Sequence, residues 1–437
     1  MNKLTVIGGG LAGCEAAYAA ANRGIEVELL EMKPAKKTAA HKSDSLAELV
    51  CSNSLKAARV DSAAGLLKEE MRRLGSVCLA AADRSAVAAG GALAVDRDIF
   101  SKLITEKIKS HPNITVTERL VTEIPQSGVT VIATGPLTDD ALAEKLAGLC
   151  DGGNLSFYDA AAPIVTAESV DMSKAFFASR YDKGGDDYIN CPMNKEEYTA
   201  FYRELINAES AALHGFDKAP NVYEGCMPIE VLAKRGEDSI RFGPLKPVGL
   251  RDPRTGHRPW AAVQLRRENA AATLFNIVGF QTNLKFSEQK RVFSMIPGLE
   301  SAEFMRYGVM HRNTFINSPK MLNRNLSLKA DKNIFIAGQL SGVEGYMESA
   351  ASGIIAGINA AAEITGEKPL VLPETTMTGA LLSYITNPLT ENFQPMGANF
   401  GIIPPLEAHI RDKRERYAAL AARALGILAE NIKTEEI

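Results

Sequence analysis

Cysteine is scarce in this sequence and widely scattered. The chain has 437 residues and only six cysteines, at positions 14, 51, 78, 150, 191 and 226, so no two lie closer than 27 residues. No Cys-x-x-Cys pair is present, which argues against a zinc cluster. Six cysteines in so long a chain also do not form the framework of a small disulfide-rich protein. The pattern predicts no metal site and a reducing, cytoplasmic location.

Long apolar runs and an excess of either charge are also lacking. No apolar stretch approaches the roughly 18 to 20 residues that a membrane-spanning helix requires. Residues 11–14 spell a lipoprotein cleavage site, but the apolar run before them covers only residues 4–7, too short for a signal peptide. With 49 Lys and Arg against 52 Asp and Glu, the formal charge is -3. We predict no membrane segment, and a polyanion must be met by a local basic patch.

The first positive signal is a glycine-rich turn near the start of the chain. Residues 4–7 predict a strand, residues 11–22 a helix and residues 25–31 a second strand, which together make a βαβ unit. Gly8 permits the turn, Gly10 lets a pyrophosphate approach the backbone, and Gly13 lets the helix pack on the strand, while Glu31 is placed to bind the adenosine ribose. This pattern predicts a dinucleotide site formed by Gly8, Gly9, Gly10, Leu11, Ala12, Gly13 and Glu31.

Two later segments select the dinucleotide. Residues 129–133 predict a strand that leads into Thr134 and Gly135, and residues 333–337 predict one that leads into Gly338 and Gln339. Flavoproteins commonly have both features, so fold analogy predicts FAD. The expected fold class is α/β, with a discontinuous Rossmann-like FAD-binding domain and an inserted α+β domain. We place the first domain at residues 1–165 and at residues 316–437, which end in a C-terminal helix, and the insertion at residues 166–315.

Two cysteines have neighbours that suit chemistry. Cys51 lies among hydroxyl and amide side chains with a lysine nearby, a setting that supports a thiolate. Cys226 lies between two glutamates, which oppose a thiolate unless they accept its proton or face away. A buried, inert thiol is the alternative for both. The remaining cysteines that we expect to be such buried filler are Cys14, Cys78 and Cys150.

A basic segment stands out in the middle of the chain. Residues 234–267 hold nine Lys or Arg against three acids, a local balance of +6. Its turn-rich loop carries Arg251, Arg254 and Arg258 and is followed by Trp260, a combination that suits an RNA backbone and an unstacked base. A solvated surface loop is the plain alternative. Two further side chains either stack on a planar ligand or belong to the core: His311 and Tyr346.

Longer matches to one family extend along nearly the whole chain. They cover residues 8–13, 48–55, 92–97, 181–184, 187–192, 224–230, 241–244, 278–282, 306–315, 337–339 and 342–346. In these stretches the sequence resembles the folate- and FAD-dependent tRNA uridine-5-methyltransferases (TrmFO), relatives of the GidA flavoproteins. The stretch at 48–55 contains Cys51, and the stretch at 224–230 contains Cys226.

The resemblance implies a reaction, its cofactors and its RNA partner. Methylenetetrahydrofolate would supply a one-carbon unit, reduced FAD the electrons, and NADH or NADPH would recharge the flavin. The acceptor would be C5 of the T-loop uridine of tRNA. By carry-over, Cys226 would be the thiolate that attacks the uracil and Cys51 the acid/base partner, although these roles are exchangeable. His311 and Tyr346 become candidates for folate or substrate contact.

Three other interpretations remain open at this point. The same chemistry on a ribosomal RNA uridine needs the same flavin, folate and cysteines. An NAD(P)H-dependent flavin oxidoreductase with a small-molecule acceptor needs neither cysteine nor the basic segment. A GidA-like RNA-binding scaffold would work in a hetero-complex. The oligomeric state is not indicated by the sequence.

Overall fold

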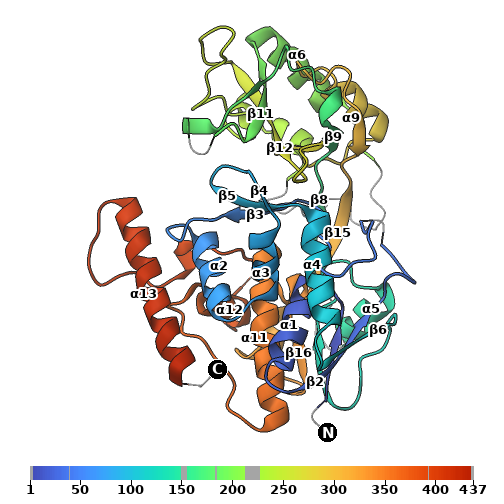
Figure 1. Ribbon diagram of the computed structural model, residues 1–437, viewed down its shortest axis with the longest axis vertical. Helices are drawn as coiled ribbons and strands as arrows, with labels where there is room; N and C mark the ends of the chain where they lie inside the picture. The colour runs from blue at the N-terminus through green and yellow to red at the C-terminus, as the bar shows by residue number, and fades with distance from the viewer. Residues whose placement is uncertain are drawn as a thin grey trace.

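The computed structural model describes residues 3–38, 40–148, 155–182, 185–211, 227–391 and 393–434. These residues form two bodies, one above the other in Figure 1. The lower body is built on a five-stranded parallel sheet in the order β16-β7-β1-β2-β6. Its strands are β1 (Lys3–Ile7), β2 (Glu26–Glu31), β6 (Ile114–Glu118), β7 (Val129–Ile132) and β16 (Ile334–Ile336).

Two helices from opposite ends of the chain pack together on this sheet. Helix α1 (Leu11–Ala21) is rich in alanine, and α11 (Tyr346–Thr365) carries Gly353 and Gly357 one turn apart. A Cβ atom at either glycine would lie within 2.3 Å of the backbone oxygen of Ala12 or Ala16, so the two helices touch backbone to backbone. The late segment of the chain is therefore an integral part of the first domain.

A small antiparallel sheet and several helices complete the lower body. The sheet has the order β3-β5-β4, formed by β3 (Ser54–Ala57), β5 (Ala92–Val95) and β4 (Ala86–Val87). The helices are α2 (Ala63–Arg73), α3 (Val77–Arg84), α4 (Arg97–Lys109), α5 (Asp140–Gly148), α10 (Ser318–Met321), α12 (Met377–Thr386) and α13 (Lys413–Thr434). Glu70 of α2 accepts hydrogen bonds from the N–H groups of Met377 and Thr378, which fixes the start of α12.

The upper body has its own sheet and its own core. Six antiparallel strands follow the order β10-β11-β12-β13-β9-β14. They are β9 (Ile164–Thr166), β10 (Phe176–Phe177), β11 (Tyr188–Met193), β12 (Ala261–Arg267), β13 (Leu274–Ile277) and β14 (Phe304–Arg306). The sheet packs with α6 (Lys195–Asn207), α7 (Ile229–Ala233), α8 (Glu237–Arg241) and α9 (Phe286–Phe293). An α/β domain with an α+β insertion is thus confirmed as the fold class.

The chain passes between the two bodies on a pair of antiparallel strands. Strand β8 (Leu155–Ala160) leads up and β15 (Met310–Phe315) leads back down, as Figure 1 shows. Contacts from loops reinforce this junction. Asp187 accepts a hydrogen bond from the Gly90 N–H at 2.7 Å, and the Tyr188 hydroxyl donates to the Ala89 carbonyl at 2.9 Å. These contacts bring the inner end of the upper sheet against the first domain.

Candidate functional site

The glycine-rich loop, residues 8–13, joins β1 to α1 with no room for side chains at two positions. Gly8 has a φ of +100°, and a Cβ atom there would lie 2.6 Å from the Ala133 carbonyl oxygen. A Cβ atom at Gly13 would lie 1.8 Å from the Gly8 carbonyl oxygen. Nothing lies within 4 Å of the position that a Cβ atom would take at Gly10, so the backbone there is open to a ligand. The loop is therefore shaped to bring the start of α1 close to a phosphate group.

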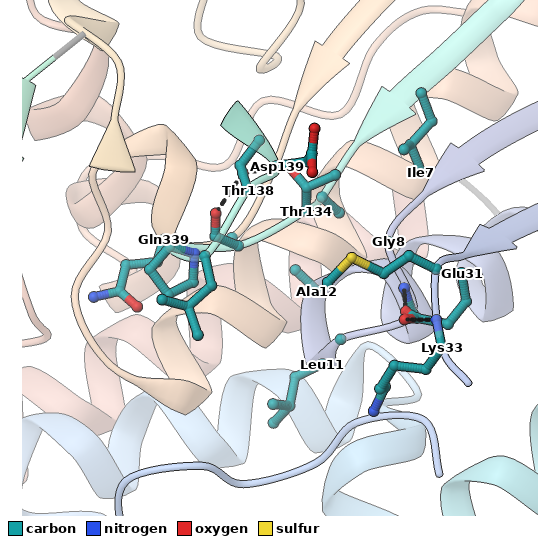
Figure 2. Close-up of a pocket in the computed structure, with 18 of the residues that line it drawn as sticks. Ile7, Gly8, Leu11, Ala12, Glu31, Lys33, Thr134, Thr138, Asp139 and Gln339 are labelled. Carbon is teal, nitrogen blue, oxygen red and sulfur yellow. Dashed lines mark hydrogen bonds between the residues drawn. The ribbon is translucent and has the colours of Figure 1, made fainter. Parts of the chain in front are cut away.

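Glu31 closes the loop from the neighbouring strand. One carboxylate oxygen accepts a hydrogen bond from the Gly9 N–H at 2.6 Å, and the other accepts one from the Lys33 N–H at 2.9 Å. The side chain is buried, lines the cavity and lies beside Lys33 in Figure 2. Each oxygen retains a second lone pair. Glu31 thus shapes the loop itself as well as being placed for a ribose hydroxyl.

The cavity extends from this loop along the carboxyl ends of the parallel strands. Its empty space, with the part open to solvent included, is about 1170 Å³. Gln339 lies on the opposite side of the cavity from Glu31 (Figure 2). The predicted cofactor residues that line the cavity are Gly8, Gly9, Gly10, Leu11, Ala12, Glu31, Thr134, Gly135, Gly338 and Gln339. The size of the cavity, the bare backbone at Gly10 and the N-terminus of α1 all suit FAD.

Cys51 lines the same cavity and is held by Tyr346. The Tyr346 hydroxyl oxygen accepts a hydrogen bond from the Cys51 N–H at 2.8 Å and lies 2.9 Å from the Cys51 sulfur. Burial, and then the nearby Cys51, raise the pKa of Tyr346 well above its usual value, so this phenol stays protonated. Tyr346 is the first residue of α11. The early and late parts of the first domain thus come into contact at the Cys51 sulfur.

Charged side chains from both bodies surround Cys51. Arg97, at the start of α4, donates to both carboxylate oxygens of Glu268, at 2.7 and 3.3 Å, and to the Leu49 carbonyl. Burial disfavours the charge on Arg97, but Glu268, Tyr346 and Cys51 outweigh that cost and raise its pKa. Arg266 and Arg306 of the upper body also interact electrostatically with Cys51. We call Cys51, Tyr346, Arg97, Arg266, Arg306 and Glu268 the cysteine site.

The cysteine loop, residues 48–56, is fixed by the upper body and by α11. Arg266 donates to the side-chain oxygens of Asn53 and Ser52, both at 3.0 Å, and Asn53 donates to the Arg267 carbonyl at 2.8 Å. At the other end of the loop, Lys56 forms an ion pair with Glu348 at 2.7 Å. The loop therefore takes its shape from contacts that are remote in the sequence.

A buried lysine supports the cysteine loop from below. Lys68 of α2 is fully buried and donates to the Leu55 carbonyl oxygen at 2.7 Å. Burial lowers the pKa of Lys68 to about 8, and the Glu348 carboxylate only partly offsets that effect. The ammonium group satisfies the loop backbone at an electrostatic cost.

The sequence alone does not assign roles to Arg97, Arg266, Arg306 or Glu268. Arg97 and Arg306 lie in the matched stretches 92–97 and 306–315, and Arg266 lies in the basic segment 234–267, which are the local signals available. The two arginines and the glutamate of the upper body come together only when β12 and β14 dock against the cysteine loop. The spacing of these three residues in the sequence does not indicate that they belong to one site.

Two predicted site residues cannot be placed by their side chains. Cys226 lies outside the described residues, so its predicted role as the attacking thiolate stays a prediction. The His311 backbone lies in β15, paired with Asp159 of β8, and its side chain is outside the description. The other cysteines agree with the filler prediction where described: burial raises the thiol pKa of Cys14 and Cys78. Cys150 also lies outside the described residues.

The predicted RNA-binding residues differ in their exposure and in their contacts within the protein. Arg251 and Arg258 are exposed. Arg254 is engaged within the protein, because its guanidinium pairs with Asp252 at 2.7 Å and donates to the Ser173 carbonyl. Trp260 is only partly exposed, and the Arg241 guanidinium lies 3.7 Å from its ring centre. These packing contacts oppose base stacking on that face of Trp260.

Neither a membrane-spanning helix nor a metal-binding cluster is found among the described residues. None of their helices combines the length and the apolar character needed to cross a bilayer. They contain no group of three or more His, Cys, Asp or Glu side chains arranged to hold a metal ion.

The fold and the cavity define a dinucleotide-binding protein of the Rossmann-like class. The family model for glucose inhibited division protein A (GIDA) matches residues 3–368. A protein of Lactobacillus gasseri named methylenetetrahydrofolate–tRNA-(uracil-5-)-methyltransferase TrmFO is 57% identical over 436 residues, 100% of this chain and 99% of that relative. A protein of the same name from Acetivibrio thermocellus is 58% identical over 429 residues, 98% of each. The chain belongs to the GIDA family and, within it, to the TrmFO proteins.

Solved structures agree with this assignment at the level of the fold. Aquifex aeolicus GidA in its form I crystal superposes with a TM-score of 0.71 at 19% identity, covering 98% of this chain and 76% of that one. The form II crystal gives a TM-score of 0.70 at 17% identity, covering 98% and 73%. The predicted family is therefore confirmed, and family membership supports the prediction of FAD.

Proposed function

We propose that the protein transfers a one-carbon unit from methylenetetrahydrofolate to C5 of the T-loop uridine in tRNA. Relatives that carry this activity in their name match the chain over its full length at about 57% identity. The observation that carries the proposal is the position of Cys51. Cys51 lines the cofactor cavity, and its sulfur lies 2.9 Å from the Tyr346 hydroxyl. Arg97, Arg266 and Arg306 interact with Cys51 electrostatically.

The first domain binds and orients the cofactor. The bare backbone of the glycine-rich loop and the N-terminus of α1 would hold the pyrophosphate, and Glu31 would bind the adenosine ribose. Thr134, Gly135, Gly338 and Gln339 form the farther walls of the cavity. FAD supplies electrons for reduction of the transferred carbon, and NADH or NADPH restores them.

The cysteines act on the uracil. C5 of uracil is a poor nucleophile until a thiolate adds at C6, and a base must later remove the C5 hydrogen. We assign the addition to Cys226 and the acid/base work to Cys51, with the reverse assignment as the alternative. The guanidinium groups near Cys51 stabilise the negatively charged form of its sulfur. His311 and Tyr346 are the candidates for contact with folate or with the base.

The upper body is the proposed RNA side of the molecule. It covers the cysteine loop and exposes Arg251 and Arg258. Arg254 and Trp260 are weaker candidates because both are engaged in contacts within the protein. We further propose that the domains divide near residues 165 and 315, and that the enzyme works in the cytoplasm without a metal ion.

Label transfer tests the proposal directly. The wild-type protein, given FAD, NADPH and labelled methylenetetrahydrofolate, should place label in the T-loop 5-methyluridine of an unmodified tRNA transcript. The Cys51→Ala variant should lose roughly 10⁴-fold in that rate and keep its flavin content. Label found only in ribosomal RNA would change the substrate, and flavin turnover without label in either RNA would favour a plain oxidoreductase or a scaffold.

A further inference from the structure

Arg306 is a half-buried cation with no hydrogen-bond or ion-pair partner among the described residues. The other two guanidinium groups of the cysteine site are satisfied: Arg97 by Glu268, and Arg266 by Asn53 and Ser52. Arg306 therefore differs from its neighbours in having no acceptor for its N–H donors within the part of the chain that the structure describes.

Arg306 lies in one row across the upper sheet with Arg266, because Arg306 pairs with Ile164, Ile164 with Asn276, and Asn276 with Arg266. Paired residues share a face of the sheet, so Arg306 is on the face from which Arg266 binds the cysteine loop.

Arg306 ends β14, where the preceding Met305 is 63% exposed while Arg306 is half-buried. Burial, and then the charge of Arg97, lower the pKa of Arg306, whereas Tyr346, Cys51 and Glu268 act in the opposite direction. Arg306 thus lies within electrostatic reach of the Cys51 sulfur.

The charges of the cysteine site do not balance. Three guanidinium groups share one carboxylate, Glu268, which leaves two positive charges in a partly buried space between the bodies. Removing an unpaired cation from water is costly, and the cost is recovered only when an anion arrives or forms beside it. The site is therefore prepared for negative charge that its own described side chains do not supply.

We propose that Arg306 contacts O4 of the target uracil and stabilises the negative charge that forms there during catalysis. This inference rests on the proposed function. When the thiolate lone pair forms the S–C6 bond, the C5=C6 π electrons move to make a C4=C5 bond, and the C4=O4 π electrons move onto O4. No other reactant is required, and the charge disappears again when C5 attacks the one-carbon unit.

The position of Cys51 favours O4 over a phosphate as the group bound. Whether Cys51 adds at C6 or removes the C5 hydrogen, the uracil ring must lie against its sulfur. O4 is bonded to C4, the ring atom next to C5, and so lies within the same small space. The phosphates of that nucleotide lie beyond its ribose. A preorganised donor at the developing oxyanion is a common source of rate enhancement.

An RNA containing 5-fluorouridine at the target position, supplied with methylenetetrahydrofolate and the reduced flavin, tests this role. After C5 has taken up the one-carbon unit, fluorine cannot leave as a proton would, so the S–C6 adduct accumulates and is measured on a denaturing gel. Arg306→Gln should slow adduct formation by roughly 10²- to 10³-fold, with RNA affinity, flavin content and flavin reduction by NADPH kept at wild-type levels. Arg306→Lys, which keeps the charge, should recover part of the rate. Arg203→Gln, an exposed arginine of the same body, should match wild type.

Other outcomes overturn the assignment in distinguishable ways. A loss of RNA affinity equal to the loss of rate would make Arg306 a phosphate contact. A shifted flavin potential in Arg306→Gln would make the flavin its partner. An unchanged adduct rate in Arg306→Gln would remove Arg306 from the reaction. If the wild-type protein formed neither adduct nor methylated tRNA, the proposed function itself would fall.

Discussion

The glycine-rich loop and the cysteine loop border the same cavity but offer it different kinds of group. The glycine-rich loop presents backbone N–H groups and is completed by Glu31, all within one βαβ unit. The cysteine loop presents a sulfur atom whose surroundings come from α4, α11 and two strands of the upper body. Cofactor binding at the glycine-rich loop therefore depends on the local shape of the backbone. The surroundings of Cys51 depend instead on how the two bodies dock.

The largest effect should come from adding one methyl group to the glycine-rich loop. In Gly13→Ala the new Cβ atom would lie 1.8 Å from the Gly8 carbonyl oxygen, so the loop or α1 must shift. We expect a loss of about 4 kcal/mol in the free energy of unfolding and loss of bound FAD. Denaturant unfolding and the flavin absorbance measure both. Gly426→Ala in α13, where nothing lies within 4 Å, should not destabilise the protein.

Neutralising Glu268, the carboxylate of the cysteine site, should disrupt the surroundings of the cysteine loop. Glu268→Gln leaves the buried Arg97 without its carboxylate, at a cost of about 3 kcal/mol in the free energy of unfolding, and misplaces Cys51. Flavin content should change less than methyl transfer. Glu300→Gln, which removes an exposed ion pair with Lys174, is the matched control. Equal loss of flavin and activity in Glu268→Gln would contradict the separation of the two regions.

The buried lysine under the cysteine loop should make stability depend on pH. The pKa of Lys68 is about 8 in the folded protein, against 10.5 for an ordinary lysine. Between these values the unfolded chain binds more protons at this position, so the free energy of unfolding should rise with pH, by roughly 2 to 3 kcal/mol. The comparison is with Lys68→Met, which lacks this contribution. Parallel curves for the two proteins from pH 8 to 10.5 would refute the prediction.

The smallest expected effect concerns the carboxylate at the end of β2. Glu31→Ala removes the acceptor for the Gly9 and Lys33 N–H groups and for the ribose, and should weaken FAD binding about tenfold. Titration of the apoprotein with FAD measures the change. Glu28→Ala on the same strand, which removes contacts with Lys3 and Thr117 and does not line the cavity, should bind FAD like wild type.

The two regions also differ in how far the sequence predicts them. The cofactor residues follow from spacing, because a strand, a tight turn and a helix place Gly8, Gly13 and Glu31 in a fixed relation. Arg266 and Arg306 belong to the same site as Cys51 only through sheet pairing and docking, which no local pattern reports. The basic character of residues 234–267 also does not show that Arg254 pairs with Asp252 or that the Arg241 guanidinium lies against Trp260.

The two-stranded junction of β8 and β15 sets a rule for recombination within this family. Because the chain enters and leaves the upper body side by side, two cuts beside β8 and β15 would exchange that body as one cassette. Yet that cassette carries Arg266, Glu268 and Arg306. A new substrate-binding body therefore brings a new half of the reaction site with it, so RNA preference and chemistry must change together.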